Sequence, residues 1–267
     1  MLAKDKPGLR AMCGSGRLHA GHFVIEFATP GIGHILAGAG AEFCFLDMEH
    51  SGFSFETVKT TLRVLRAAGV APLVRVPSGA YHHVARALDC GAEGVMVPMV
   101  ATADQAASLV RHARYWPEGQ RGCAFGIAHD DYRGGTPAEK MAAANARTTT
   151  FALIETAEGA RNADSIAATP GLDCIWVGHF DLSASLGVPG DFASGAYRDA
   201  QGAICAAARR HGKALGKLVG SRAEAEQAVA DGFTLICYGG DVWLLQAAVA
   251  EGVRTVHALD SGRQETV

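Results

Sequence analysis

Short apolar runs alternate with longer stretches of helical spacing along this chain. Runs of four to eight apolar residues between turn residues are typical of buried strands, whereas apolar positions three or four residues apart indicate a helix. The clearest run is 43–49 (FCFLDME), and the clearest helical spacing joins Val58, Leu62 and Leu65. We expect strands at 22–28, 43–49, 71–76, 94–97, 151–154, 173–177, 214–219 and 233–238.

A helix is expected after each of these strands, and Thr102 can serve as the N-cap of the fourth. The expected helices cover 30–40, 55–68, 81–90, 102–113, 158–168, 197–211, 223–231 and 242–256. An irregular segment, 114–149, separates the fourth helix from the fifth strand, with a further short helix expected at 137–146. A connection of this length inside a compact domain is usually functional or mobile.

Eight strand–helix units in a chain of this length predict an α/β fold of the (β/α)8 TIM-barrel type, for which about 250 residues is typical. No composition shift or polar linker divides the chain, so we expect a single domain over 1–267. A doubly wound sheet is the alternative fold. Its glycine fingerprint is only partly matched, because Gly31 and Gly33 are followed by Leu36, and Gly14 and Gly16 precede the first strand.

The composition is that of an ordinary globular protein, with 49% hydrophobic and 19% charged residues and a formal net charge of −3. No basic stripe or nucleic-acid-binding signature is present, so we expect no nucleic-acid partner. We expect no membrane association either, because no apolar run has membrane-spanning length and no signal-peptide pattern is visible. The seven cysteines are scattered without a CxxC pair, which is typical of a reducing compartment and predicts a cytoplasmic protein.

Ionisable residues stand where several of the expected strands end. Asp47, Glu49 and His50 stand at the end of the most apolar strand, Arg75 at the end of the third, and Glu155 directly after the fifth. In a (β/α)8 barrel the carboxyl ends of the strands meet at one face, and the active site lies there. The simpler explanation for the second strand is a buried strand followed by a solvated turn.

Four of these side chains could form a catalytic set. His50 can transfer a proton near neutral pH, and Arg75 can bind a carboxylate or stabilise an enolate. Glu155, together with Asp181 after the sixth strand, could hold Mg²⁺ or Mn²⁺. Taken singly, an acid after a strand often caps a helix, and an arginine is often in a surface ion pair.

The ordered motifs resemble those of the class II pyruvate aldolases of the HpcH/HpaI family, from about Ala20 to Val256. The motifs are LDMEH, VRVP, GAEGVMVPMV with RYWPEGQRG, LIET and VGHFDLS. The resemblance implies a barrel of the phosphoenolpyruvate/pyruvate-binding type. It also implies a carbon–carbon lyase (aldehyde-lyase) that depends on Mg²⁺, Mn²⁺ or Co²⁺. Its reaction would be reversible cleavage of a 4-hydroxy-2-oxo acid to pyruvate, or a substituted pyruvate, and an aldehyde through a metal-stabilised enolate.

The same resemblance assigns roles to individual residues. His50 corresponds to the catalytic acid/base, and Asp89 to the carboxylate that raises its basicity. Arg75 corresponds to the arginine that binds substrate and stabilises the enolate. Glu155 and Asp181 correspond to the metal ligands, and the backbone amides of Phe180 and Asp181 to the site for the pyruvate carboxylate. Family members are typically hexamers, trimers of dimers that exchange the last helix, so we expect a homo-oligomer.

Two positions depart from the family pattern. Leu153 stands where the family often has a glutamine that contacts substrate, and His179 replaces the proline of the usual GP-x-D. His179 could touch the substrate or a metal-bound water, or be a packing histidine. The segment 125–132 could shape the aldehyde side of the site or be a surface loop.

Other functions stay open at this point. A related barrel lyase could act on an acyl-CoA or on another 2-oxo acid. A nicotinamide-binding module would need the missing glycine fingerprint, and a noncatalytic barrel would leave the acid/base set without a task. An imine route is a further possibility, for which Lys217 is the one lysine inside an expected strand.

Overall fold

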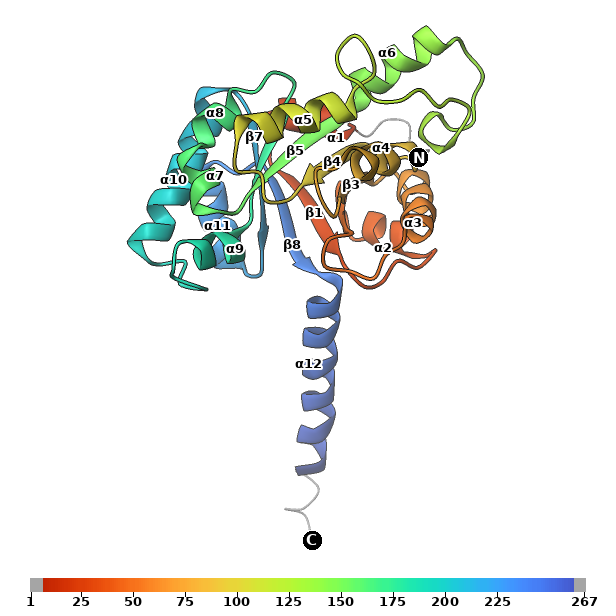
Figure 1. Cartoon of the computed structure of the whole chain (residues 1–267). Helices are drawn as coiled ribbons and strands as arrows, with labels where there is room; N and C mark the ends of the chain where they lie inside the picture. Colours follow the sequence, from red (N-terminus) through yellow and green to blue (C-terminus); the bar gives the residue numbers. More distant parts are fainter. Residues whose placement is uncertain (1–6, 262–267) are drawn as a thin grey trace.

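Eight parallel strands close into a barrel in the order β1 to β8, with β8 paired to β1 (Figure 1). The computed structural model describes residues 7–261. The strands are β1 His19–Val24, β2 Phe43–Asp47, β3 Ala71–Arg75, β4 Gly94–Val97, β5 Thr149–Ile154, β6 Cys174–Val177, β7 Ala214–Val219 and β8 Leu235–Gly240. The predicted (β/α)8 barrel is therefore confirmed.

Helices surround the barrel and connect its strands. They are α1 Leu9–Gly14, α2 Ile32–Gly38, α3 Phe55–Ala67, α4 Tyr81–Asp89, α5 Ala103–Ala113, the 3-10 turn η2 Ala128–Asp130, α6 Pro137–Arg147, α7 Ala157–Arg161, α8 Ala163–Ala167, α9 His179–Ser185, α10 Gly195–Arg210, α11 Arg222–Asp231 and α12 Asp241–Ser261. Several begin at a hydroxyl N-cap, including the expected Thr102, whose side chain accepts a hydrogen bond from Gln105 N–H. No helix within residues 7–261 is both long and apolar enough to cross a membrane.

The core has two layers, one inside the barrel and one between the strands and the helices. The inner layer includes the fully buried rings of Phe43, Phe151 and Trp176. Close packing requires glycine at β7, because a Cβ at Gly216 would lie 2.0 Å from the Trp176 ring. Leu9 of α1 belongs to the same inner layer, so α1 closes the amino end of the barrel and leaves the carboxyl end as the place for a site.

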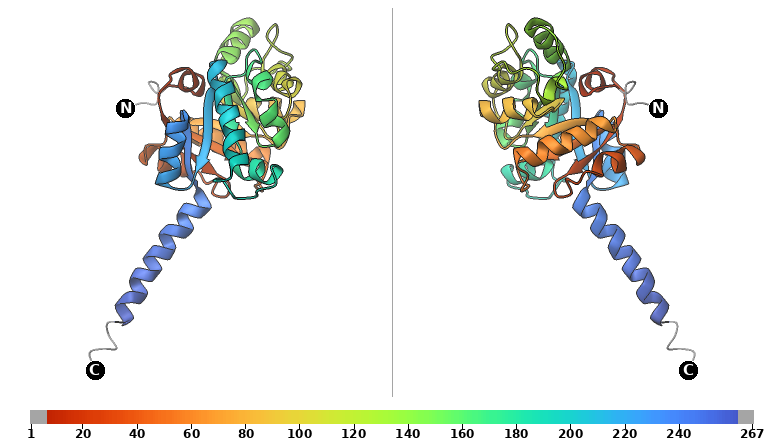
Figure 2. Two further views of the ribbon diagram at one scale, coloured as in Figure 1. Left: turned by 90° about the vertical axis from the view of Figure 1, so that its left-hand side faces the viewer. Right: turned by 90° about the vertical axis from the view of Figure 1, so that its right-hand side faces the viewer.

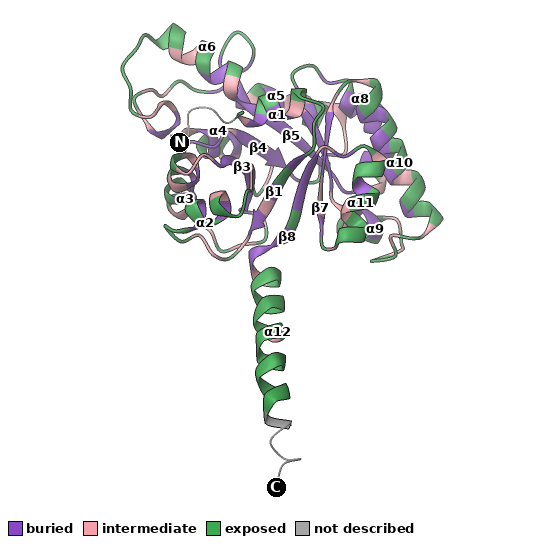
Figure 3. Ribbon diagram, turned by 180° about the vertical axis from the view of Figure 1, so that it is seen from behind, coloured by how far each residue is buried: buried purple, intermediate pink, exposed green. Residues whose placement is uncertain are grey.

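The last helix does not fold back onto its own barrel. After β8 the 21-residue α12 extends away from the carboxyl end of the strands, as all views show (Figures 1 and 2). The exposed residues along it contrast with the buried strands (Figure 3). The helix is also longer than the expected 242–256, and the exchange that the family resemblance implies would use this element.

Several expected boundaries were wrong for identifiable reasons. The first strand begins at His19 and ends at Val24, because the N–H groups of residues 25–27 bond to the Asp241 side chain and not to a strand. The helix expected at 158–168 is two short helices that meet at Asn162. The short helices α1 and α9 were not predicted, because six or seven residues carry too little periodicity.

Candidate active site

A cavity of about 400 Å³ opens at the carboxyl ends of the strands. Six of the seven residues that the sequence assigned to the site line this cavity, and the seventh, Asp89, does not. The six are His50, Arg75, Glu155, His179, Phe180 and Asp181. They come from β3, α9 and the turns after β2 and β5, so the closure of the barrel brings them together.

Arg75 is fixed by a carboxylate that sequence reasoning left out of the catalytic set. Arg75 Nε and Nη2 donate to the two oxygens of Asp47, at 2.8 Å each, across the paired ends of β2 and β3. Burial alone would lower the pKa of the Arg75 guanidinium, but the hydrogen bonds and charge of fully buried Asp47 raise it. A fork-to-fork pair of this kind fixes the plane of the guanidinium as well as its charge.

Asp47 also shapes the turn that carries His50. Its carboxylate accepts the N–H groups of Glu49 at 3.0 Å and His50 at 3.2 Å. The His50 ring itself is 60% exposed, so it can reach a substrate from the rim of the cavity. Asp47 could have been found as an acid at a strand end, two residues before the Glu49–His50 pair.

Glu49 points into the same cluster of charges. One of its oxygens, Oε2, lies 3.2 Å from Arg75 Nε and 3.9 Å from His50 Nε2. This oxygen is buried and has no hydrogen-bond partner, because Arg75 Nε–H is directed at Asp47. Burial raises the pKa of the Glu49 carboxyl, and its attraction to Arg75 and His50 opposes that shift.

Glu155 stands buried just after β5. Its Oε1 accepts the N–H of Met99 at 2.7 Å, and Met99 holds a left-handed backbone conformation with φ 57°. Burial raises the pKa of the Glu155 carboxyl to about 7, and the negative charges of Glu49 and Asp181 add to the shift. Repulsion by neighbouring carboxylates favours the neutral form of a buried acid, and the Arg75 charge opposes this effect at Glu155.

These residues fit a magnesium-type cation. No group of three or more His, Cys, Asp or Glu side chains in the described part of the chain forms a metal cage by itself. Mg²⁺ needs no such cage, because it usually takes one or two carboxylates and keeps several waters. Glu155 and Asp181 provide such a pair on one cavity wall, and a cation there would offset the repulsion that helps to raise the pKa of Glu155.

Asp89 lies far from the cavity of its own chain. Helix α4 runs back from the end of β3 to the start of β4, so its last residue is at the amino end of the barrel. The Asp89 carboxylate is 30% exposed and accepts a hydrogen bond from Arg121 Nη2 at 2.6 Å. Asp89 therefore does not meet His50 within one chain, and the role that the family resemblance gives it stays a prediction.

The segment 125–132 lies at that amino end too. It connects α5 to β5 and contains η2, and Figure 1 shows α6 at the opposite end of the barrel from α12. The suggestion that it shapes the aldehyde side is wrong within one chain. The segment is also more than a loose surface loop, because His129 inside it is buried and bonds to the Ala124 carbonyl at 2.7 Å.

Helix α9 begins directly after Gly178 and places two of the predicted residues. Its first intrahelical bond runs from Leu182 N–H to the Gly178 carbonyl, so the N–H groups of residues 179–181 point outward from the helix start. The His179 ring packs on Phe180 at 4.4 Å and on Phe192 at 5.2 Å between ring centres. Burial lowers the pKa of His179 to about 4, and the nearby Lys217 charge adds to the shift. The ring is therefore neutral at physiological pH.

Apolar and aromatic side chains form the rest of the cavity wall, and sequence reasoning did not single out most of them. Leu153, the residue at the family's glutamine position, is fully buried among them. The others on this wall are Phe23, Ile25, Phe45, Trp176, Leu218 and Trp243. Alternating apolar residues do not reveal which face of a strand points into the barrel, so these rings could not be selected in advance.

Lys217 points away from this cavity. Its β7 neighbours Gly216 and Leu218 face the barrel interior, one beside Trp176 and one on the cavity wall. Since successive side chains alternate along a strand, Lys217 faces the outer helices. It therefore cannot form an imine with a ketone bound among the residues described above.

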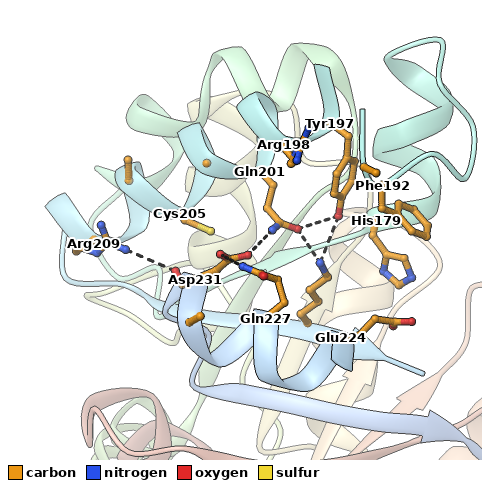
Figure 4. Close-up of a pocket in the computed structure, with 15 residues that line it drawn as sticks. His179, Phe192, Tyr197, Arg198, Gln201, Cys205, Arg209, Glu224, Gln227 and Asp231 are labelled. Atoms are coloured by element: carbon orange, nitrogen blue, oxygen red, sulfur yellow. Dashed lines mark hydrogen bonds between the residues drawn. The ribbon is translucent and has the colours of Figure 1, made fainter. Parts of the chain in front are cut away.

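A separate cavity of about 830 Å³ lies between α10 and α11 on the Lys217 side (Figure 4). Lys217 Nζ donates to Gln201 Oε1 at 2.7 Å and lies 3.4 Å from the Tyr197 hydroxyl. Gln201 Nε2 in turn donates to Asp231 Oδ2 at 2.8 Å. These groups satisfy one another's hydrogen-bonding capacity, which suits a structural network between β7, α10 and α11.

Comparisons with known proteins agree with this geometry. Residues 22–248 match the family model of HpcH/HpaI aldolase/citrate lyase. A hydroxypyruvate/pyruvate aldolase of Paraburkholderia phytofirmans is 39% identical, over 79% of this chain and 84% of that protein. A 5-keto-4-deoxy-D-glucarate aldolase of Shigella boydii is 35% identical, over 80% of this chain and 82% of that protein.

A solved structure points the same way. The HpcH/HpaI aldolase from Desulfitobacterium hafniense superposes with a TM-score of 0.88 at 32% identity, covering 93% of this chain and 96% of that one. Fold, cavity and sequence similarity therefore lead to one assignment. The chain belongs to the HpcH/HpaI aldolase/citrate lyase family.

Proposed function

We propose that the protein is a class II aldolase that reversibly cleaves a 4-hydroxy-2-oxo acid to an aldehyde and pyruvate, or a substituted pyruvate. Its family consists of carbon–carbon lyases, and the two relatives above are aldolases by name. One observation carries the proposal for this chain. A proton-transfer group (His50), a fixed cation (Arg75) and two carboxylates (Glu155 and Asp181) line a single cavity at the carboxyl end of the barrel.

Substrate binding would use the two donor groups of the cavity. The outward N–H groups of Phe180 and Asp181 at the start of α9 suit the carboxylate of a 2-oxo acid. The Arg75 guanidinium, held in one plane by Asp47, suits an oxygen on which negative charge develops. Glu155 and Asp181 would hold Mg²⁺, Mn²⁺ or Co²⁺, which when bound acts as a Lewis acid toward the 2-oxo acid.

The bond-breaking step assigns one task to each of two side chains. His50 takes the proton of the C4 hydroxyl as the C3–C4 bond breaks and the aldehyde forms. The electron pair of that bond passes into the enolate of pyruvate, and Arg75 stabilises its negative charge. Return of a proton to C3 completes pyruvate, and the reverse sequence makes the carbon–carbon bond.

The projecting helix supports an oligomer. Apolar residues along α12 are exposed, namely Leu244, Leu245, Val249, Val253, Val256 and Leu259. The outward-facing Tyr238 of β8 is exposed as well. We infer that α12 packs on the barrel of a second copy, and that the assembly is the hexamer, a trimer of dimers, typical of the family.

The position of Asp89 supports a further role for that assembly. Its carboxylate is partly exposed at the amino end of the barrel, and the His50 ring is exposed at the other end. A pairing of the two side chains requires two chains. We infer that Asp89 acts on the His50 of a neighbouring copy, where it would raise the basicity of the ring.

The cysteines support a reducing compartment such as the cytoplasm. All seven are free, and Cys44, Cys174, Cys205 and Cys237 are buried. Burial raises the pKa of each of these four thiols, which makes them poor nucleophiles and suits a structural role.

A panel of aldehydes with pyruvate tests the proposed reaction. We expect carbon–carbon bond formation detected by mass spectrometry, its loss after EDTA, and recovery on adding Mg²⁺, Mn²⁺ or Co²⁺. Full activity after EDTA treatment would contradict the metal assignment. Competition by coenzyme A would favour the related barrel lyases that act on an acyl-CoA.

The variant His50→Ala tests the assignment of the base. It should reduce cleavage by at least about a hundredfold, in the range of general-base catalysis. Metal affinity and the melting temperature should stay near their wild-type values, because the ring is at the rim and outside the core. Near-parental kcat in this variant would remove His50 from the mechanism.

A further inference from the structure

The first turn of α12 forms part of the active cavity. Because α12 starts directly after β8, it begins at the same end of the barrel as the catalytic groups. Trp243 in this turn lines the cavity together with His50 and Phe180, and its side chain is 50% exposed. A large ring at the mouth of a cavity, half open to solvent, is placed to meet a bound molecule.

The indole is held by a continuous row of aromatic rings. Trp243 stacks on Phe23, with ring centres 5.9 Å apart and planes 17° apart. Phe23 meets Phe45 edge to face at 4.8 Å, and Phe45 meets Trp176 at 5.4 Å. The Arg75 guanidinium lies over both Phe45, at 5.4 Å, and Phe23, at 5.9 Å. The row therefore extends from the mouth of the cavity to the charged group of the proposed reaction.

The backbone on either side of Trp243 leaves space for the indole and is held by hydrogen bonds. A Cβ at Gly240 would lie 2.6 Å from the indole ring and 3.0 Å from Phe23, so glycine leaves the space that the stacked pair occupies. The buried carboxylate of Asp241 accepts the N–H groups of Ile25 at 3.2 Å, Glu26 at 3.0 Å and Phe27 at 2.7 Å. These bonds tie the turn to the loop after β1, which supplies another wall residue, Ile25.

The cavity thus has two chemically different sides. His50, Arg75, Glu155 and Asp181 provide the polar side, and the aromatic row provides the other. We propose that Trp243 is a specificity-determining residue, and that with Phe23 it selects a reactant with a flat, apolar substituent such as an aryl group. The inference rests on the proposed aldolase function. The substituent can be on the aldehyde or on C3 of the 2-oxo acid, since the same wall would bind either.

Two series of kcat/KM ratios test the inference on the full-length protein. The first keeps pyruvate and compares benzaldehyde with glycolaldehyde. The second keeps glycolaldehyde and compares phenylpyruvate with pyruvate. In the series whose aryl group binds the aromatic wall, Trp243→Ala should lower the ratio of kcat/KM for the aryl reactant to that for the small one about tenfold. Hydrophobic pockets discriminate between substrates on this scale. Trp243→Phe should keep the ratio within about twofold, because a flat ring remains.

Controls separate this inference from the proposed function and from effects on folding. Gln246→Ala, a polar and exposed position three residues along α12 and outside the cavity, should leave both ratios unchanged. If Trp243→Ala fails to fold, Trp243→Leu replaces it, since leucine is apolar but not flat. Unchanged ratios in both series, or a wild type that rejects both aryl reactants while accepting the small ones, overturn the inference. A wild type inactive with every pair overturns the proposed function instead.

Discussion

At the scale of single residues, Gly178 is what lets Glu155 occupy its place in the cavity. A Cβ at Gly178 would lie 2.4 Å from Glu155 Oε2 and 2.7 Å from Glu155 Cβ. The backbone angle of Gly178 is an ordinary φ of −88°, so the requirement is for space and not for a left-handed conformation. The absence of a side chain at the last residue before α9 therefore leaves room for the Glu155 carboxylate, just after β5.

The variant Gly178→Ala tests this steric role. The added methyl should displace the Glu155 carboxylate and weaken Mn²⁺ binding, measured by calorimetry, by about 10- to 100-fold. It should also cost about 1–3 kcal/mol of the free energy of unfolding, as overpacking does. Gly195→Ala is the matched control, because no atom lies within 4 Å of its added Cβ. Wild-type Mn²⁺ affinity in Gly178→Ala would refute the placement of the metal at Glu155.

Residues differ in how much of their role a sequence pattern can reveal. His50, Arg75, Glu155 and Asp181 were predictable as one group, because each follows a strand and barrels collect strand ends. The place of Asp89 at the opposite end of the barrel was not, because family similarity transfers a residue's role without its position in the fold. Phe23 and Trp243 were not either, because apolar residues look alike in sequence whether they face a cavity or a core.

At the scale of elements, the alternation of side chains along β7 bears on the choice between an imine route through Lys217 and a metal-dependent route. One step along the strand separates cavity-lining Leu218 from Lys217, which bonds to α10. Since a shift of one residue moves a side chain to the other face of a sheet, strand geometry excludes this lysine from the active cavity. Sequence alone placed Lys217 on a strand but could not give the face.

The variant Lys217→Met should therefore keep both catalysis and its response to EDTA. Treatment of the wild type with pyruvate and borohydride should leave its activity intact and add no mass to the protein. The unfolding free energy should fall by no more than about 1.5 kcal/mol, because Gln201 still accepts a hydrogen bond from Tyr197. Pyruvate trapped covalently on Lys217 would reverse this conclusion.

Elements also differ in how well the hydrophobic periodicity of the sequence predicts them. All eight strands and the longer helices were predicted, some to the residue, as with β4 at Gly94–Val97 and β7 at Ala214–Val219. The short α9, which carries Phe180 and Asp181, was read as a loop. Its seven residues are held by Gly178 and by packing on Phe192, contacts that no local pattern contains.

At the scale of the whole molecule, the two ends of the barrel carry different parts of the proposed site. His50 and Glu155 are at the carboxyl end, whereas Asp89 is at the amino end beside Arg121. If Asp89 acts on the His50 of the neighbouring copy, no single chain holds all the catalytic residues of one site. A chain that lacks one of these residues can then be complemented by a chain that has it. Such a contact can be reciprocal across a two-fold axis, with each of two copies supplying Asp89 to the other.

Mixing two inactive variants tests this arrangement. Unfolded and refolded together, His50→Ala and Asp89→Ala should regain a fraction of wild-type activity, because some sites combine an intact His50 with an intact Asp89. The control mixture of His50→Ala and Glu155→Gln should not regain activity. Both residues line the cavity of the same chain, so every site in the mixture still contains one of the two substitutions. Equal activity from the two mixtures would show that Asp89 does not act across the interface.

The projecting α12 links the stability of the protein to its concentration. Apolar residues of α12 face solvent in the single chain. If the helix packs on a second copy, as proposed above, it gains that stabilisation only when the copy is present. Mass action then makes the melting temperature fall on dilution. Because Trp243 in the same helix lines the cavity, dilution should loosen substrate discrimination along with the fold.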